Sequence, residues 1–267
     1  MIRNALIIIF IFVGLALARP AQAQIQRQQD LNGWGWVQLY KTIDTTKYVS
    51  LQYQVRFNNN VSTFQSNNFY FVGGINPTKN LNIEALYQIN TNRFKDLNTF
   101  YAGITYRIKV NKKISFYVRT AYQYNQNHLF NPEFITHPYS EWRNRVRLKY
   151  RVNKRLNLAF SGEPTLHFNI LQHQTYLDKI RFVSQATYQL NKYSSMTVFY
   201  MIQPQIEAYK GTPGTNYMMG LTYQINLPNK LKKFDNIFKL DKKGKKNEDN
   251  QQEEELDQKI PVFNSQL

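Results

Sequence analysis

Long stretches of the chain alternate apolar and polar residues with a period of two. From residue 49 to residue 57 the odd positions are apolar, and the even positions are Ser50, Gln52, Gln54 and Arg56. Successive side chains of a β-strand point to opposite faces of the sheet, so this pattern predicts strands with one apolar and one polar face. Eleven such strands are predicted, and they begin near Trp34, Tyr48, Phe69, Leu81, Asn98, Ile114, Glu141, Leu156, Lys179, Ser195 and Asn216. In the first of them, Trp34 and Trp36 are out of phase with Val37 and Leu39, so its apolar face is ambiguous.

The predicted strands are long and carry aromatic residues near their ends. They run for about 10 to 13 residues, whereas strands of globular proteins average about 5 to 6 and membrane-crossing strands need about 9 to 11. The aromatic residues toward the ends of the apolar faces are typical of an interfacial girdle: Phe57, Tyr106, Tyr122, Tyr124, Tyr150, Tyr188 and Tyr223. Lipid offers no partner to unpaired backbone groups, so such strands must form a closed sheet. We therefore expect an all-β fold, an antiparallel transmembrane up-and-down β-barrel. The alternative is a soluble barrel whose apolar face points inward.

Short and long connections alternate along the chain. The tight turns at residues 76–79, 110–113, 152–155 and 190–193 contain Asn and Lys and are assigned to the periplasmic side, while the longer links at residues 125–139, 169–176 and 211–214 are assigned to the outside. Single-chain bacterial barrels have even strand numbers, so we expect twelve strands, with ten as the second choice. The turn at residues 44–47 resembles the periplasmic set. If this turn is periplasmic, the first strand begins on the outer side of the membrane. The chain would then reach that side only if residues 24–32 cross the membrane once more or thread the lumen.

Both ends of the chain differ from this pattern. Residues 1–23 have a cation at Arg3, an apolar run of roughly 14 residues and small residues at Ala21 and Ala23, which predicts a secretory signal peptide cleaved after Ala23. An uncleaved anchor is the alternative. Residues 24–228 are predicted to form the barrel. Residues 229–267 are predicted to be a disordered periplasmic tail, with a basic stretch at 239–246 and an acidic one at 248–257 that could fold back on each other or bind an unidentified periplasmic partner.

Composition and charge narrow the class of protein. The chain has no Cys, which excludes a small disulfide-bonded scaffold in the oxidising compartment that the signal peptide implies. It carries 34 basic and 17 acidic residues. No nucleic-acid-binding motif accompanies this excess, and we expect no nucleic-acid partner for an exported chain. The expected location is the outer membrane of a Gram-negative bacterium, with membrane lipids and small anionic solutes as partners.

The polar faces of the strands carry most of the charge that would line a lumen. The densest feature is a basic ladder on alternate positions of one strand, formed by Arg143, Arg145, Arg147, Lys149 and Arg151. The other charges expected in the lumen are Arg56, Glu84, Arg107, Lys109, Arg119, Glu141, Glu163, Lys179, Arg181 and Glu207. One interpretation is a porin-like channel whose cations attract anions. The other is a non-conducting structural or surface-binding barrel, in which the arginines fill a narrow lumen by pairing with the glutamates.

Three segments carry a resemblance to a known family. The stretches Trp34-Gly35-Trp36-Val37, residues 51–57 and residues 142–150, with their alternating aromatic residues and arginines, resemble the family called domain of unknown function 2490. The resemblance would cover Gly33 to about Leu227. It implies a barrel of unassigned activity.

Enzymatic and metal-binding functions have little support in the sequence. The four histidines, His128, His137, His167 and His173, fall in or near the outward loops, and a hydrolase at the rim of the barrel is the least favoured function. Ser161 and His167 share a phase but lie six residues apart, whereas a nucleophile and its base must touch. No close histidine pair predicts a metal site. We therefore expect no catalytic residue, metal or cofactor.

Overall fold

A computed structural model of the chain describes residues 29–91, 96–127, 138–169, 174–206 and 214–228. These residues form a closed all-β barrel of eleven strands. The strands are β1 (Gln29–Thr42), β2 (Lys47–Asn58), β3 (Thr63–Thr78), β4 (Leu81–Thr91), β5 (Asp96–Lys109), β6 (Ile114–Asn127), β7 (Tyr139–Arg151), β8 (Leu156–Asn169), β9 (Gln174–Asn191), β10 (Ser194–Pro204) and β11 (Thr215–Leu227). The described residues contain no helix that is long and apolar enough to cross a membrane. The predicted signal peptide, the predicted tail and Glu207 lie outside the described residues.

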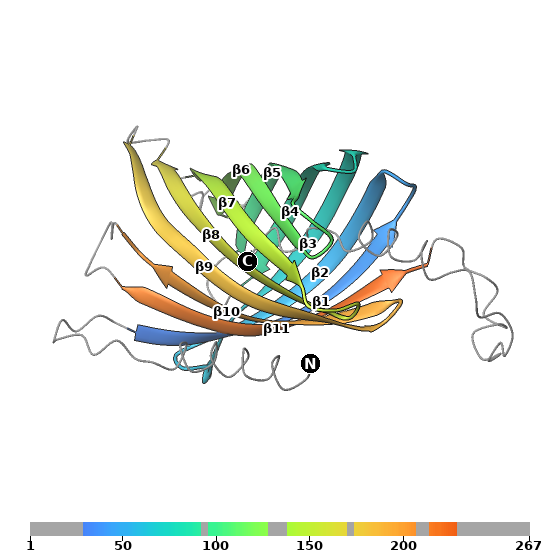
Figure 1. Cartoon of the computed structure of the whole chain (residues 1–267). Helices are drawn as coiled ribbons and strands as arrows, with labels where there is room; N and C mark the ends of the chain where they lie inside the picture. The colour runs from blue at the N-terminus through green and yellow to red at the C-terminus, as the bar shows by residue number, and fades with distance from the viewer. Residues whose placement is uncertain (1–28, 92–95, 128–137, 170–173, 207–213, 229–267) are drawn as a thin grey trace, which may run out of the picture.

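Each strand follows its predecessor around the barrel wall, and the sheet closes where β1 meets β11 (Figure 1). All neighbouring strands are antiparallel except this last pair, which is parallel from Gln29↔Thr215 to Lys41↔Leu227. The expected number of twelve strands, with ten as second choice, is therefore wrong for the described residues. In an up-and-down barrel with an odd number of strands the first and last strands run in the same direction, so only a parallel pair can close it. Both rows of backbone groups are still paired, and no edge remains.

One end of the barrel carries short turns with a repeated chemistry. Side-chain oxygens of Asp44, Asn111, Asn153 and Asn191 each accept hydrogen bonds of 2.7–2.8 Å from backbone N–H groups two or three residues later. Such side chains mimic a backbone turn and favour tight reversals. At Asp44 the backbone N–H groups that follow also hold the pKa of the exposed carboxyl below its usual value. We call this the turn end and the opposite end, where residues 128–138 and 205–214 connect strands, the loop end.

Apolar residues cover the outside of the barrel. On every strand the exposed large side chains are mostly apolar, and on β2 Val49, Leu51 and Tyr53 alternate with buried or half-buried polar residues. This is the face that a soluble barrel would turn inward. The ambiguity at β1 is also resolved, because Val37 and Leu39 face outward while Trp36 is buried inside. Exposed aromatic residues lie toward both ends: Tyr106, Tyr150, Tyr188 and Tyr223 toward the turn end, and Tyr53, Phe69, Phe100, Tyr122 and Trp142 toward the loop end.

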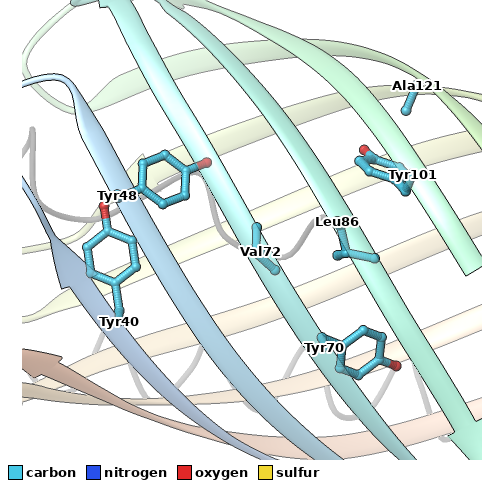
Figure 2. Packing of buried hydrophobic residues seen from close by; sticks show 7 residues of the cluster. All are labelled: Tyr40, Tyr48, Tyr70, Val72, Leu86, Tyr101 and Ala121. Carbon is cyan, nitrogen blue, oxygen red and sulfur yellow. The ribbon is translucent and has the colours of Figure 1, made fainter.

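The interior of the barrel holds two clusters of buried apolar side chains. The first comes from β1 to β6 and consists of Tyr40, Tyr48, Tyr70, Val72, Leu86, Tyr101 and Ala121 (Figure 2). The second surrounds Trp36 and consists of Val183, Phe199, Met201 and Met218, with Trp34 packed against it. The rings of Trp36 and Tyr70 meet edge to face, with centroids 6.5 Å apart, and connect the two clusters. Apolar and aromatic side chains therefore form a continuous group on the inner wall between β9 and β3, beside buried polar residues such as Gln38 and Gln54.

The parallel seam depends on a glycine. Gly220 of β11 faces Trp34 of β1 in the ladder. A Cβ atom at Gly220 would collide with the backbone oxygen of Trp34 and with the ring of Phe199. Only a residue without a side chain lets the two strands approach while Phe199 fills the interior beside them.

Candidate functional site

The basic ladder lies on the inner face of β7. Arg143, Arg145 and Arg147 are buried, at 4%, 3% and 8% exposure, while the residues between them are exposed on the outside. Lys149 and Arg151 continue the same face toward the turn end and are half-buried. Strand alternation alone produces this arrangement, because residues two positions apart share a face.

The loop-end half of the ladder converges on one carboxylate. Glu163 of β8 is fully buried and accepts hydrogen bonds from Nε and Nη2 of Arg143 at 2.7 and 2.5 Å. Arg119 of β6 forms a short ion pair with the second carboxylate oxygen. Arg145 and Arg181 approach at 3.7 and 3.5 Å. One carboxylate from β8 thus holds four guanidinium groups from β6, β7 and β9.

A second charged group lies closer to the loop end, on β7, β8 and β9. The ammonium of Lys179 contacts Glu141 at 2.9 Å and Asp178 at 2.6 Å. Register shifts between Thr165 and Leu166, so Asp178 has no partner opposite it and its side chain joins that of Lys179. A β-bulge of this kind redirects a side chain within a strand.

This second group also contains three possible metal ligands. The ligand atoms of Glu141, His167 and Asp178 lie within 4.8 Å of one another. His167 stacks between Tyr139 and Tyr176, with ring centroids 4.8 and 5.0 Å apart. The three side chains could hold a divalent cation only if the Lys179 ammonium, which contacts both carboxylates, moved away. Sequence reasoning did not predict this group, because alternation alone does not reveal the bulge at Asp178.

The opposite wall presents a cation held by neutral groups. Arg56 of β2 lies 4.5 Å over the ring of Trp34 and donates to Gln54 at 2.8 Å and to the hydroxyl of Tyr70 at 3.2 Å. No carboxylate within the described part of the chain pairs with it. Further toward the turn end, buried Glu84 accepts from the hydroxyls of Tyr101 and Tyr48 at 3.3 and 3.5 Å.

A polar vestibule at the loop end connects the two walls. It is a cavity of about 370 Å³, lined mainly by Asn and Gln side chains together with Trp34, Arg56, Tyr139, Glu141, Arg143, Lys179, Arg181 and Met218. Six cations lie in or just beneath it (Arg56, Arg119, Arg143, Arg145, Lys179 and Arg181) against three carboxylates (Glu141, Glu163 and Asp178). The cavity therefore has a net positive charge and a wall of groups that both donate and accept hydrogen bonds.

Side chains fill the middle of the lumen beneath this vestibule. Five side chains from four strands have no exposed surface: Gln54, Asn68, Glu163, Thr165 and Met201. Water does not reach these positions, although they point inward. In this conformation the interior is packed rather than open.

The turn-end half of the ladder has a different environment. Neither Arg147 nor Lys149 has a carboxylate within 4 Å among the described residues. The Nε of Arg147 is buried and has no hydrogen-bond acceptor. Arg107 of β5 and Arg151 of β7 add positive charge at the same end of the barrel.

Nothing in the described residues assembles a catalytic pair. Ser161 and His167 lie on the same strand, β8, and no hydrogen bond joins them within the described ranges. Ser161 faces Arg147 on β7, and His167 faces Glu141. His128, His137 and His173 lie outside the described residues.

Comparisons with known proteins give a family match and a weak similarity to a solved structure. The model of a family described as "Protein of unknown function (DUF2490)" matches residues 31–210. No curated protein matches the chain. Among solved structures, the chain is similar to one titled "NanC porin structure in rhombohedral crystal form", with 10% sequence identity and a TM-score of 0.46 over 73% of this chain and 99% of that one. A similarity of this strength supports no inference about what the barrel binds.

Proposed function

The chain belongs to the DUF2490 family of proteins of unknown function, and we propose that it is an integral outer-membrane barrel that binds small anionic solutes in its loop-end vestibule. The observation that carries the proposal is Arg56, a cation that lines the vestibule and whose partners among the described residues are Trp34, Gln54 and Tyr70, none of them a carboxylate. A cation without a carboxylate partner in a concave site attracts anions, because low-dielectric walls focus its field.

Membrane residence is supported by the outer surface. Its strands have 11 to 18 residues and exposed apolar faces, with exposed aromatic residues toward both ends. A soluble protein rarely exposes an apolar surface of this extent. Residues 1–23 would direct export and be removed, residues 24–228 would form the barrel, and residues 229–267 would lie in the periplasm. Fractionation tests this: the folded chain should require detergent for extraction, and release by carbonate alone would contradict residence in the membrane.

Quenching of Trp34 fluorescence tests the vestibule. A variant with Trp36→Phe and Trp142→Phe retains Trp34 as its one tryptophan. Iodide should quench this residue several-fold more strongly than caesium, because the vestibule concentrates anions. Arg56→Gln should remove most of the difference, while Arg107→Gln, at the turn end, serves as the matched control and should preserve it. Equal quenching by the two ions would contradict an anion-attracting vestibule.

A porin-like channel is the second candidate, favoured by the cations that continue below the packed middle of the lumen. Arg147, Lys149 and Arg151 extend the same wall to the turn end, as a path for anions would require. Conduction would need the side chains around Glu163 to move apart. Single-channel recording separates the two candidates: the packed lumen predicts a silent barrel, whereas steady anion-selective current would establish the channel.

A further inference from the structure

The turn end of the barrel carries exposed positive charge on its outside. Within the described residues, every exposed Lys or Arg lies at this end, in or beside the turns that join β1 to β2, β3 to β4, β5 to β6, β7 to β8 and β9 to β10. Two of the turns contain a pair of such residues, Lys112 with Lys113 and Lys154 with Arg155. The others are Lys47, Lys79, Lys109 and Lys192. We call these exposed cations the basic collar.

Little negative charge accompanies the basic collar. Residues 42–47, 78–81, 109–114, 151–156 and 191–194, which contain the turns, include one acidic residue, Asp44. Its carboxylate lies 3.7 Å from the ammonium of Lys47 and also accepts hydrogen bonds from the backbone of its own turn. The turns follow one another around the closed sheet, so the positive charge is distributed around the barrel and is not gathered in a pocket. Such a ring fits a charged surface better than a single small anion.

Exposed aromatic residues indicate the depth of the basic collar. On the outer face of β7, Trp142 and Tyr150 are exposed near opposite ends of the strand. Eight residues span about 27 Å along a strand, and a tilt of about 40° reduces this to roughly 20 Å across a membrane. Aromatic girdles flank an apolar band of about 25 Å in outer-membrane barrels. Lys154 and Arg155 come shortly after Tyr150 in the chain, so they lie just beyond the girdle, at the level of lipid head groups.

Exposed apolar side chains lie beside the cations. Ile43 and Val110 are each 58% exposed, and Val110 continues the outward phase of Ile108 on β5. The ammonium of Lys192 lies 5.0 Å over the exposed ring of Tyr193. Tyrosine rings are typical of membrane interfaces, and lysine side chains there keep their apolar stems in contact with apolar surface while the charge reaches water and head groups. The layer that covers the apolar outer surface therefore also reaches the basic collar.

We propose that the basic collar binds the phosphate head groups of anionic phospholipids in the membrane leaflet at the turn end. The proposal rests on membrane residence, which is part of the proposed function, and is independent of what the vestibule binds. Lysine and arginine close to an anionic membrane surface are attracted to it, and the attraction falls off within a Debye length. Anionic lipids should therefore be enriched around the turn end of the barrel relative to the loop end.

Quenching of tryptophan fluorescence by brominated lipids tests this enrichment at both ends of one strand. The full-length chain is folded into phosphatidylcholine vesicles with a minor fraction of phosphatidylglycerol. Bromine is placed on the acyl chains of either the phosphatidylglycerol or an equal amount of the phosphatidylcholine. Tyr150→Trp with Trp142→Phe reports on the turn end, and native Trp142 is the matched reporter at the loop end. The ratio of quenching by phosphatidylglycerol to quenching by phosphatidylcholine should be several-fold higher at position 150, and high salt should lower it.

Charge removal in the adjacent turn tests which side chains are responsible. With the reporter at position 150, Lys154→Gln together with Arg155→Gln should remove most of the preference for phosphatidylglycerol. Arg107→Gln is the matched control, because it removes a half-buried cation of β5 at the same end of the barrel, outside the basic collar. The preference should persist in this control. Equal losses in the two variants would show that the lipid responds to the overall charge of the barrel, and would overturn the proposal.

A second reporter keeps the test valid if the first variant folds poorly. Tyr106→Trp with Trp142→Phe reports on β5, and its preference should fall with Lys112→Gln together with Lys113→Gln. Equal ratios at the turn end and the loop end would overturn the proposal and leave membrane residence intact. Loss of the preference on adding inorganic phosphate at constant ionic strength would also overturn it, because the turns would then bind a free anion. Absence of quenching by either lipid would contradict membrane residence, and the proposal with it.

Discussion

The two halves of the ladder on β7 use the same residue types on the same face of one strand, yet they are in opposite electrostatic situations. Toward the loop end, Arg143 and Arg145 share the carboxylate of Glu163 with two further arginines. Toward the turn end, Arg147 and Lys149 have no carboxylate within 4 Å among the described residues. The difference arises from β8, which presents Glu163 to one half and Ser161 to the other. What an arginine does inside this barrel is therefore decided by its neighbour across the sheet.

Removing the shared carboxylate should have the largest effect on stability. Glu163→Gln leaves four guanidinium groups without their common counter-charge, and we expect a loss of about 3 to 5 kcal/mol in the free energy of unfolding. The measurement is urea unfolding in lipid vesicles. Glu84→Gln is the control, since Glu84 is also buried but accepts hydrogen bonds from neutral tyrosine hydroxyls. A loss at position 163 no larger than at position 84 would show that the four-arginine cluster does not depend on this carboxylate.

Replacing one arginine in each half of the ladder by methionine should change the free energy of unfolding differently in the two halves. Arg143→Met removes two hydrogen bonds to Glu163 and one of 2.9 Å to Gln123, so we expect a loss of about 2 to 3 kcal/mol. In the barrel truncated after Pro228, Arg147→Met removes a buried cation without a carboxylate partner and should be neutral or stabilising. Unfolding free energies of the two variants in that truncated background give the comparison. Equal losses would mean that the halves do not differ in energy.

A carboxylate introduced opposite Arg147 should give the turn-end half of the ladder an ion pair like those of the loop-end half. Ser161 is buried and directly faces Arg147, so Ser161→Glu should stabilise the barrel by about 1 kcal/mol through a new ion pair. A double-mutant cycle with Arg147→Met measures the pairing itself. If Ser161→Glu has the same effect with and without Arg147, no such pair forms.

A change in salt concentration should affect the stability of the barrel less than any of these substitutions. Screening weakens repulsion between the cations of the turn-end half, so raising the salt concentration from about 0.05 to 0.5 M should stabilise the truncated barrel by a few tenths of a kcal/mol. The free energy of unfolding of the truncated Arg147→Met variant should change less with salt. If the truncated barrel and this variant respond equally, the salt effect does not arise from the cations of the turn-end half.

The alternation of apolar and polar residues and the residue types of the turns were enough to predict most strands of the barrel and several of its short turns. The structure confirms the all-β barrel class, and β-strands occur near all eleven predicted starts. The short turns at Asn111, Asn153 and Asn191 follow from local hydrogen bonds between a side chain and the next backbone groups, and such contacts need no distant partner. The prediction failed at the seam, because the direction in which β1 and β11 meet depends on the whole chain.

On the strands that alternate cleanly, the sequence by itself determined which residues share a face, since successive side chains of a strand point to opposite sides. The structure decided which face lines the interior, and it also decided the facing of β1. The sequence did not determine what the inward-facing residues do there. Glu163 joins Arg119, Arg143, Arg145 and Arg181 from three other strands, and a bulge at Asp178 moves a carboxylate toward Lys179 and Glu141. Strand register, barrel closure and bulges bring these charges together, and these features arise from contacts between segments far apart in the chain. The tertiary structure alone therefore decided which cations are neutralised and which remain available to bind an anion.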